Sequence, residues 1–541
     1  MLSLSLHNMS LMEWLVMAFM IGLLMFLGSI AYNLFFHPLA NVPGPLLGRA
    51  SGIPSWYYAY RGTRHIWLWQ QFQIYGSKIR PEPNTVLFCD PEAYTDIYGM
   101  KANVRRSKFY TAWQRNENDK TTLNTVDVAE HAQKRKLLNL AFTEKSVRAA
   151  SSFIIQHVDR WHQLLVGEND GGWSPAVDFS EKVDSLVFDI MGDLCFGKSF
   201  GVKESGANPL KAVPHNITNY MRFYYPICRS PFLDLVVWMK PRGLNKLFEL
   251  LTPPPVQKYY QFVHKSVTDR IALHQEQSQK PEVERRQDIF YFLCEARDPD
   301  TGLPAYDEAT LRAEANLLII AGSDTTAISL SGIFFYLTGD PLRYQKLVQE
   351  IRTTFDLAED IVYGPKLLSL VYLRACIDEG MRLTPTGPSE LPREVLTGGL
   401  RVKGEYFPAG TIVGTSAWAN SRNQEVYGDP EVFRPERWIV DEAKFVTEKE
   451  VARTRSNFHP FAAGPGNCIG KNFAMMELMI VVARTIHRLD VRREPGSTVG
   501  AGAPEKGWGA RNRTQLQVID AYISLRRGPM VQFRKRQQPN N

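Results

Sequence analysis

A single cysteine at the end of a glycine-rich turn constrains this chain more than any other feature. Residues 461–470 read FAAGPGNCIG, and an apolar stretch with helical spacing follows directly after them. Gly464, Gly466 and Gly470 allow the backbone to turn sharply and to come close to a flat ligand. We expect Cys468 to lie at the start of the following helix, where the helix dipole lowers the pKa of a thiol and favours the thiolate.

A thiolate on such a turn is a ligand type that holds haem iron from one side. Loop N–H groups without helical partners can donate to the sulfur and tune it. The alternative is a buried free thiol near a helix start, which is also our expectation for the other cysteines. No two of the six cysteines have CxxC spacing, so a zinc ribbon is not indicated, and a chain of 541 residues needs no disulfide framework.

A second motif lies near the middle of the chain, where residues 321–326 read AGSDTT. Apolar residues recur upstream at helical spacing, so we expect the motif on a long, largely buried helix in which Gly322 leaves room for a ligand. Asp324 and Thr325 place an acid and an alcohol among apolar neighbours, which costs free energy unless they have partners or a role. They could form a short proton relay. The alternative is a threonine hydroxyl that bonds back to its own helix.

A charge network is predicted from two later segments. Glu379 and Arg382 stand three residues apart in LRACIDEGMRL, and on its own such a pair is weak evidence. The segment FRPERW then adds Arg437, which can complete a charge-assisted network of one glutamate and two arginines.

The N-terminal region has the length and composition of a membrane anchor. Residues 14–36 carry no charge, and 23 helical residues cross a hydrocarbon core of about 30 Å. A cleaved signal peptide has a basic leading segment and a shorter apolar run, whereas residues 1–13 contain no Lys or Arg. The positive-inside rule therefore predicts a short luminal tail, a single span and a cytosolic remainder.

The rest of the chain reads as one unit. Three prolines within residues 37–45 cannot continue a helix and predict a stiff hinge after the anchor. No linker divides residues 46–541, so we expect one large domain, and a net charge of +7 is too mild to indicate nucleic acid binding. The interrupted apolar segment 223–238 could either dip into the membrane surface or belong to the core.

These motifs, in this order, resemble the cytochrome P-450 superfamily. FAAGPGNCIG is similar to its haem-binding loop FxxGxRxCxG, with Phe461, Gly464, Cys468 and Gly470 at matching positions. AGSDTT resembles the family's oxygen-activation motif, and ExxR followed by FxPERW resembles its structural triad. The loop departs from the family at Gly466, because the family has an arginine there that contacts a haem propionate.

The resemblance also suggests which cations hold the haem. EHAQKRKLL resembles the family helix with the pattern WxxxR, with His131 at the tryptophan position and Arg135 four residues later. LPR resembles the segment that supplies another arginine, here Arg393. We therefore expect His131, Arg135 and Arg393 to bind the propionates in place of a side chain at Gly466. A surface salt bridge is the alternative for each.

The implied fold is mainly α with small β-sheets (α+β), behind one transmembrane helix in the endoplasmic reticulum membrane. YNLFFHPLANVPGP and DIMGDLCFGKSFG resemble microsomal fungal enzymes, many of which act in secondary metabolism. The implied cofactor is haem b on the Cys468 thiolate, with Asp324 and Thr325 delivering protons. The implied electron donors are NADPH–cytochrome P-450 reductase and cytochrome b5, with Lys134, Lys136, Lys145 and Lys471 as candidate docking residues.

The implied activity is insertion of one oxygen atom from O2 into a hydrophobic small molecule, by hydroxylation, epoxidation or multistep oxidation. Family pockets draw on the loop after residue 100, the region around 210–250 and the helix near Ala321. Phe109, Tyr110, Trp113 and Phe223 predict an aromatic, apolar pocket. One alternative is an oxygen-independent haem-thiolate isomerase or dehydratase, which needs no relay. The other is a non-catalytic membrane haem protein, which only the missing arginine supports.

Overall fold

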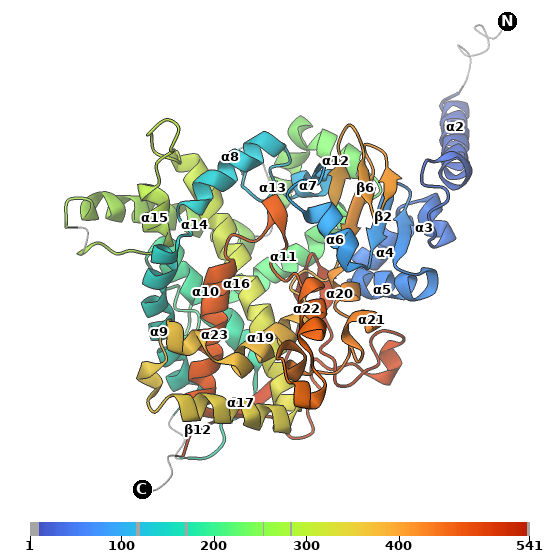
Figure 1. The fold of residues 1–541 in the computed structure, drawn as a ribbon. Helices are drawn as coiled ribbons and strands as arrows, with labels where there is room; N and C mark the ends of the chain where they lie inside the picture. The colour runs from blue at the N-terminus through green and yellow to red at the C-terminus, as the bar shows by residue number, and fades with distance from the viewer. Residues whose placement is uncertain (1–9, 115–118, 168–170, 253, 282–283, 538–541) are drawn as a thin grey trace, which may run out of the picture.

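Helices make up most of the molecule, and small sheets lie to one side and at the base (Figure 1). The computed structural model describes residues 10–114, 119–167, 171–252, 254–281 and 284–537. The longer helices are α2 (Leu11–Ala31), α5 (Arg64–Tyr75), α8 (Val128–Asn139), α9 (Glu144–Val166), α10 (Phe179–Phe196), α11 (Val213–Cys228), α14 (Pro254–Gln277), α16 (Glu308–Gly339), α17 (Pro341–Thr354), α19 (Val371–Leu383) and α23 (Lys471–Arg488). This architecture confirms the prediction of a mainly helical fold with small sheets.

Shorter elements connect and flank these helices. The short helices are α3 (Leu46–Ala50), α4 (Ile53–Tyr60), α6 (Pro91–Tyr98), α7 (Lys108–Trp113), α12 (Leu233–Met239), α13 (Leu244–Leu251), α15 (Ile289–Glu295), α18 (Pro365–Leu368), α20 (Ala417–Asn420), α21 (Gln424–Tyr427) and α22 (Glu448–Ser456). The strands are β1 (Lys78–Glu82), β2 (Thr85–Phe88), β3 (Val104–Arg106), β4 (Val177–Asp178), β5 (Arg393–Val395), β6 (Leu400–Val402), β7 (Glu405–Phe407), β8 (Ile412–Thr415), β9 (Leu489–Arg493), β10 (Ile519–Ala521), β11 (Ile523–Leu525) and β12 (Met530–Lys535).

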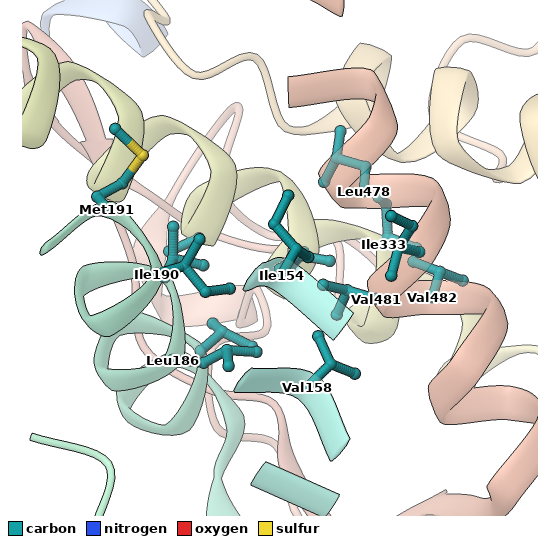
Figure 2. Close-up of a cluster of buried hydrophobic side chains, with 14 of the residues drawn as sticks. Ile154, Val158, Leu186, Ile190, Met191, Ile333, Leu478, Val481 and Val482 are labelled. Carbon is teal, nitrogen blue, oxygen red and sulfur yellow. The ribbon is translucent and has the colours of Figure 1, made fainter. Parts of the chain in front are cut away.

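The main core lies where α9, α10, α16 and α23 meet (Figure 2). Helix α16 is apolar on nearly all sides, so it is buried along most of its length rather than along one stripe. Apolar side chains of α16 and of its neighbours interdigitate there. Those labelled in Figure 2 are Ile154, Val158, Leu186, Ile190, Met191, Ile333, Leu478, Val481 and Val482.

The largest sheet places two strands that matter for the site next to each other. Its strand order is β1-β2-β8-β5-β3, and β3 pairs antiparallel with β5. In this register Arg106 lies directly opposite Arg393, and Arg105 lies opposite Glu394. Since side chains alternate between the faces of a strand, the two arginine side chains share one face of the sheet.

The N-terminal helix projects away from the body (Figure 1). By length and composition, Leu11–Phe36 and α16 are candidate membrane spans, but α16 lies in the core whereas none of the N-terminal helix is buried. The helix starts at Leu11 rather than at the predicted residue 14, because Ser10 and Glu13 form a capping box. Of the predicted tail, residues 1–9 lie outside the described part of the chain.

The proline-rich segment 37–45 is packed rather than free. Leu39 and Val42 are buried, and Arg80 of β1 donates its N–H to the Pro43 carbonyl at 2.7 Å. A Cβ on Gly44 would lie 2.4 Å from the Arg80 carbonyl oxygen, so the segment lies directly against the sheet. The predicted hinge is therefore a fixed connection at this point.

Candidate active site

A cavity of about 540 Å³ brings most of the sequence-predicted site residues together. Cys468, Phe461 and Gly470 of the cysteine loop line it, and so do five residues of α16, namely Ala321, Gly322, Asp324, Thr325 and Thr326. Most of its surface is apolar, which suits a hydrophobic ligand. Segments far apart in the sequence thus contribute to one chamber.

The cysteine loop owes its shape to one glycine above all. Gly464 has φ +63°, and a Cβ there would lie 2.0 Å from the Tyr98 carbonyl oxygen. Only glycine fits this position, because both the backbone conformation and the close approach exclude a side chain. The loop then closes through the Cys468 N–H, which donates to the Phe461 carbonyl at 2.7 Å.

The Cys468 thiol is open to the cavity, but its acidity differs from our expectation. Burial raises the pKa of Cys468, against the opposing effects of the Gly470 N–H and the Arg135 charge. This direction is opposite to the lowered thiol pKa that we predicted from the helix dipole. Helix α23 begins only at Lys471, so the sulfur lies three residues before the helix and gains less from its dipole.

Helix α16 presents the acid and the alcohol at the cavity. The Thr325 hydroxyl donates to the Ala321 carbonyl at 2.7 Å, which is the back-bonded arrangement that we considered as an alternative. Its oxygen can still accept a hydrogen bond from the cavity side. Asp324 is buried, and its Oδ2 has no hydrogen-bond partner among the residues that the structure describes. Met191 fills the space beside Gly322, so that glycine serves helix packing more than ligand approach.

The Asp324 carboxyl group can hold a proton near neutral pH. Burial, and secondly the nearby charge of Asp184, raise its pKa to about 7, while Arg526 acts in the opposite direction. Arg526 pairs with Asp184 at 2.6 Å and donates to the Ser331 hydroxyl at 3.0 Å. This pair connects α10, α16 and the strand region after β11, and the sequence motifs did not indicate it.

Three arginine side chains line another part of the cavity wall. Arg106, Arg135 and Arg393 line the cavity, and within the described residues none of them forms an ion pair with a carboxylate. His131 stands beside them, and burial together with the arginine charges lowers its pKa to about 4. Its buried Nε2 has no hydrogen-bond partner in the described part of the chain. Buried cations of this kind are costly unless an anionic ligand neutralises them.

These features fit a haem. The mostly apolar cavity offers one thiol for the iron, and the unpaired arginines offer partners for the two propionates. No group of three His, Cys, Asp or Glu side chains that could hold a separate metal ion occurs among the described residues.

The comparison with protein families agrees with this geometry. A family model described as Cytochrome P450 matches residues 56–506. The chain belongs to the cytochrome P450 family. Similar curated proteins include the cytochrome P450 monooxygenase apf7 of Gibberella fujikuroi, 32% identical over 94% of this chain and 95% of the relative. Another is the cytochrome P450 monooxygenase fscF of Fusarium equiseti, 32% identical over 97% of each chain.

A third relative is the cytochrome P450 monooxygenase AKT7 of Alternaria alternata, 31% identical over 94% of each chain. Family and relatives together make this chain a cytochrome P450 monooxygenase, and the P450 family implies a haem-thiolate cofactor.

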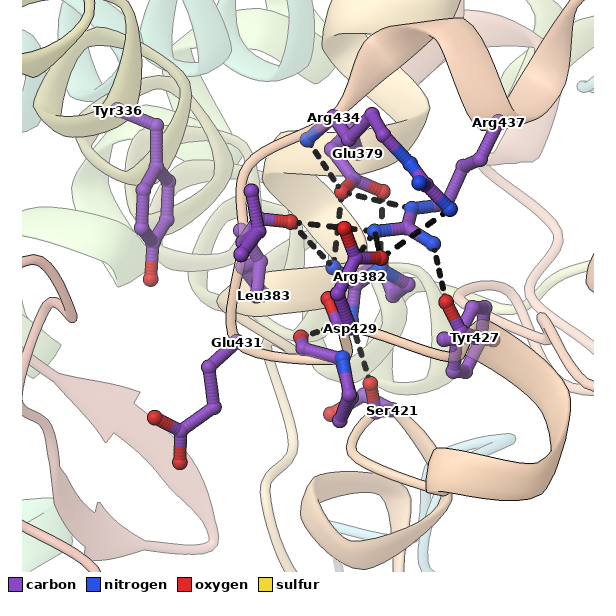
Figure 3. Close-up of polar contacts among 12 residues, drawn as sticks. Tyr336, Glu379, Arg382, Leu383, Ser421, Tyr427, Asp429, Glu431, Arg434 and Arg437 are labelled. Carbon is purple, nitrogen blue, oxygen red and sulfur yellow. Dashed lines mark hydrogen bonds and ion pairs between the residues drawn. The ribbon is translucent and has the colours of Figure 1, made fainter.

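Behind the cavity, the predicted charge network of this P450 is assembled around one carboxylate (Figure 3). Glu379 is fully buried and accepts from Arg382 at 2.8 Å through both of its oxygens and from Arg437 Nε at 3.0 Å. It also accepts from the Arg434 N–H at 2.8 Å and the Trp438 indole at 3.0 Å. Burial would raise its pKa, but Arg382 and then Arg437 lower it to about 2.

The predicted pocket residues of the P450 divide into three groups. Tyr110, Trp113 and Ala321 line the cavity. Phe109 is buried one layer behind, against Tyr110 and Trp113. Phe223 is 68% exposed and lies outside the lining, so that prediction was wrong. Its neighbours Tyr224 and Tyr225 are the buried ones, and sequence spacing alone does not tell which face of a helix is inside.

Sequence reasoning missed several residues that line the P450 cavity. Tyr259 donates to Asn316 at 3.0 Å, and both contribute polar groups to an otherwise apolar wall. Arg106 was also missed, although it is the last residue of β3, which pairs with the strand that bears Arg393. The adjacent basic residues in VRRSKF were the available signal.

Proposed function

We propose that this P450 is a membrane-anchored enzyme that inserts one oxygen atom from O2 into a hydrophobic intermediate of fungal secondary metabolism. Haem b would be held by the Cys468 thiolate, and electrons would come from NADPH through a reductase. The observation that carries the proposal is one apolar cavity shared by the Cys468 thiol, the Asp324–Thr325 pair and unpaired arginines. When bound, the thiolate-ligated haem supplies the oxygen activation and cleavage chemistry.

The chain's own residues would control protons and water around that chemistry. Asp324 can hold a proton at the cavity wall and release it toward the cavity, since its pKa lies at about 7. The Thr325 hydroxyl, one residue on, can receive that proton and donate another into the cavity. This pair favours an oxygen-dependent reaction over the isomerase or dehydratase alternative, which requires no proton delivery.

The lining favours a substrate that is mainly apolar. Trp113, Tyr110, Ile217, Met221 and Ile320 supply aromatic and branched surface. Such a wall suits a polyketide, terpenoid, alkaloid or steroid skeleton, with hydroxylation, epoxidation or multistep oxidation as the outcome.

The reduced, carbon monoxide-bound absorption spectrum tests the proposal. The wild-type protein should show the strongly red-shifted Soret band of thiolate-ligated haem, and Cys468→Ala should lose it. Cys89→Ala, which removes a half-buried thiol elsewhere, should retain the band. A wild-type band at the position of histidine-ligated haem would contradict Cys468 ligation, and a normal band without product in reductase assays would favour the non-catalytic alternative.

The membrane arrangement is part of the same proposal. The N-terminal helix would cross the endoplasmic reticulum membrane once, and a second contact would come from α12 and α13. Neither α12 nor α13 buries any residue, and they expose Leu235, Trp238, Leu250 and Leu251. Exposed apolar side chains on short helices suit the membrane interface.

Docking of an acidic reductase would use the basic residues near the cysteine loop. Lys471 is exposed at the start of α23, whereas Lys136 is already paired with Asp300 at 2.7 Å. We therefore expect Lys471→Glu to slow reduction by the reductase, and Lys535→Glu in β12 to leave it unchanged. Equal rates in the two variants would contradict this docking surface.

A further inference from the structure

Polar side chains of α11, α14 and α16 line one part of the cavity. Tyr259 of α14 donates its hydroxyl to the Asn316 Oδ1 atom of α16 at 3.0 Å. Both residues line the cavity, and α14 packs against α16 and α11. Asn216 and Tyr220, which lie one turn apart on α11, line it as well. These amides and phenols stand in a wall that is mostly apolar, so they mark a place where a ligand can form hydrogen bonds.

The Asn316 amide has a donor to offer to such a ligand. Its Oδ1 accepts from Tyr259, and this contact assigns the other end of the amide as the NH2 group. Among the described residues, the Asn316 Nδ2 atom donates to no protein acceptor. An amide N–H in an apolar wall is unfavourable unless an acceptor meets it. This arrangement favours a ligand oxygen next to Asn316.

The charge of this part of the cavity selects the kind of oxygen. Within the described ranges, the lining residues of α11, α14 and α16 include no Lys or Arg. The arginines of the lining come instead from β3, α8, α19 and β5. A carboxylate bound at Asn316 would lose its hydration without a cation to balance its charge. A neutral carbonyl oxygen accepts from the amide without that penalty.

Helix α16 sets the distance between Asn316 and the acid and alcohol of the relay. The helix runs from Glu308 to Gly339 as one element. Asn316 and Thr325 are nine residues apart on it, which is about 14 Å along the axis at about 1.5 Å per residue. Ile320 and Ala321 line the cavity between them. A ligand held at Asn316 therefore presents to the Thr325 region an atom about 14 Å from its anchored oxygen.

We propose that Asn316 is a specificity-determining residue of this P450 and binds a neutral carbonyl oxygen at one end of an elongated, otherwise apolar substrate. The inference rests on the proposed function and names the substrate class for that site. The apolar lining holds the chain, and a C–H bond about 14 Å from the carbonyl lies beside Thr325. Tyr259 is a positioning residue, because it orients the Asn316 amide.

Three probes of matched chain length test the anchor in the full-length holoprotein, namely 2-dodecanone, dodecane and dodecanoate. Equilibrium dialysis of the labelled compounds gives their affinities without turnover. We expect Asn316→Leu to bind 2-dodecanone about threefold to tenfold more weakly than the wild type, as for loss of one hydrogen bond between neutral groups, and to keep its affinity for dodecane. Tyr259→Phe should show a smaller loss for the ketone alone. The control Asn219→Leu, on the exposed side of α11, should match the wild type.

The position of oxidation tests the distance independently. With 2-dodecanone and 2-tetradecanone, the wild type and a reductase should oxidise a carbon at the same separation from the carbonyl in both ketones. Asn316→Leu should spread the products over several carbons, because the anchored end is released. Affinity from dialysis decides the anchor if neither ketone is turned over.

Four results would count against this inference. Unchanged affinity of Asn316→Leu for 2-dodecanone removes the anchor, and an equal loss for the ketone and dodecane indicates a structural role of Asn316. Tighter binding of dodecanoate than of 2-dodecanone contradicts the choice of a neutral oxygen. Oxidation at a constant separation from the methyl end contradicts the distance along α16. Lack of a thiolate-type carbon monoxide spectrum in the wild type would instead overturn the proposed function.

Discussion

The buried carboxylate of Glu379 allows a stability prediction that the structure makes quantitative. It accepts five hydrogen bonds from four residues, and all of its surface is buried. A fall in its pKa from 4.5 to about 2 corresponds to about 3 kcal/mol of stabilisation of the ionised form, because each tenfold change in acidity is worth about 1.4 kcal/mol. Mutational loss of one partner from a buried ion pair costs a similar 3–5 kcal/mol or so.

We therefore expect Glu379→Gln to lower the free energy of unfolding by about 3 kcal/mol at pH 7. The pKa of Glu379 is depressed in the folded state, so its contribution is complete above the unfolded value of 4.5 and declines as pH falls toward about 2. The difference between the wild type and the variant should shrink to about 2 kcal/mol at pH 3.5.

Urea titrations of the holoprotein, followed by the Soret band and by tryptophan fluorescence, measure these differences. Glu144→Gln is the matched control, because Glu144 pairs with Arg148 on the surface, with side chains 80% and 70% exposed. That control should change stability by less than about 0.5 kcal/mol. A loss below about 1 kcal/mol for Glu379→Gln, or a loss that is independent of pH, would refute the assignment of a stabilising ionised carboxylate.

Three further predictions follow from the site and the anchor. Asp324→Asn should slow product formation by about a hundredfold while the carbon monoxide spectrum is retained. Turnover of the wild type should decline as pH rises through about 7, because Asp324 loses its proton there. The same decline in the Asp324→Asn variant would contradict the relay. Gly464→Ala should prevent haem incorporation, because the new Cβ meets the Tyr98 carbonyl. The control Gly496→Ala should incorporate haem, because Gly496 has a similar φ of +77° but no described atom within 4 Å of its Cβ position. Equal haem content in the two variants would contradict the steric explanation. The full chain should resist alkaline carbonate extraction from membranes, and deletion of residues 1–36 should allow extraction; a mature N-terminus beyond residue 36 would instead indicate a cleaved signal sequence.

Local sequence was sufficient for the features that depend on spacing along one segment. The cysteine loop, the acid and alcohol on one helix and the Glu379–Arg382 pair three residues apart are all determined within a few turns of backbone. The mainly helical fold and the family also followed from the order of these motifs, and the family comparison confirmed both. Tyr110 and Trp113 were placed at the cavity because the resemblance put pocket residues after residue 100, and α7 does bring both to the cavity lining.

Features that depend on contacts between distant segments could not be predicted in this way. Phe223 was assigned to the pocket because family pockets draw on the region around 210–250, but packing of α11 turns Tyr224 and Tyr225 inward instead. The pKa of Cys468 also differs in direction from our expectation, because burial by the surrounding chain raises it.

The sequence by itself determined which chemistry this protein carries, because a thiolate loop and a relay motif are short-range patterns. Only the tertiary structure decided which charges meet at the cavity. Arg106 and Arg393 are 287 positions apart, and the antiparallel register of β3 and β5 alone sets them opposite each other. The contact at Gly466 is of the same kind, since a Cβ there would lie 2.8 Å from Arg393 Nη2. Electrostatic repulsion and steric exclusion act through space and not along the chain, so the sequence alone does not show them.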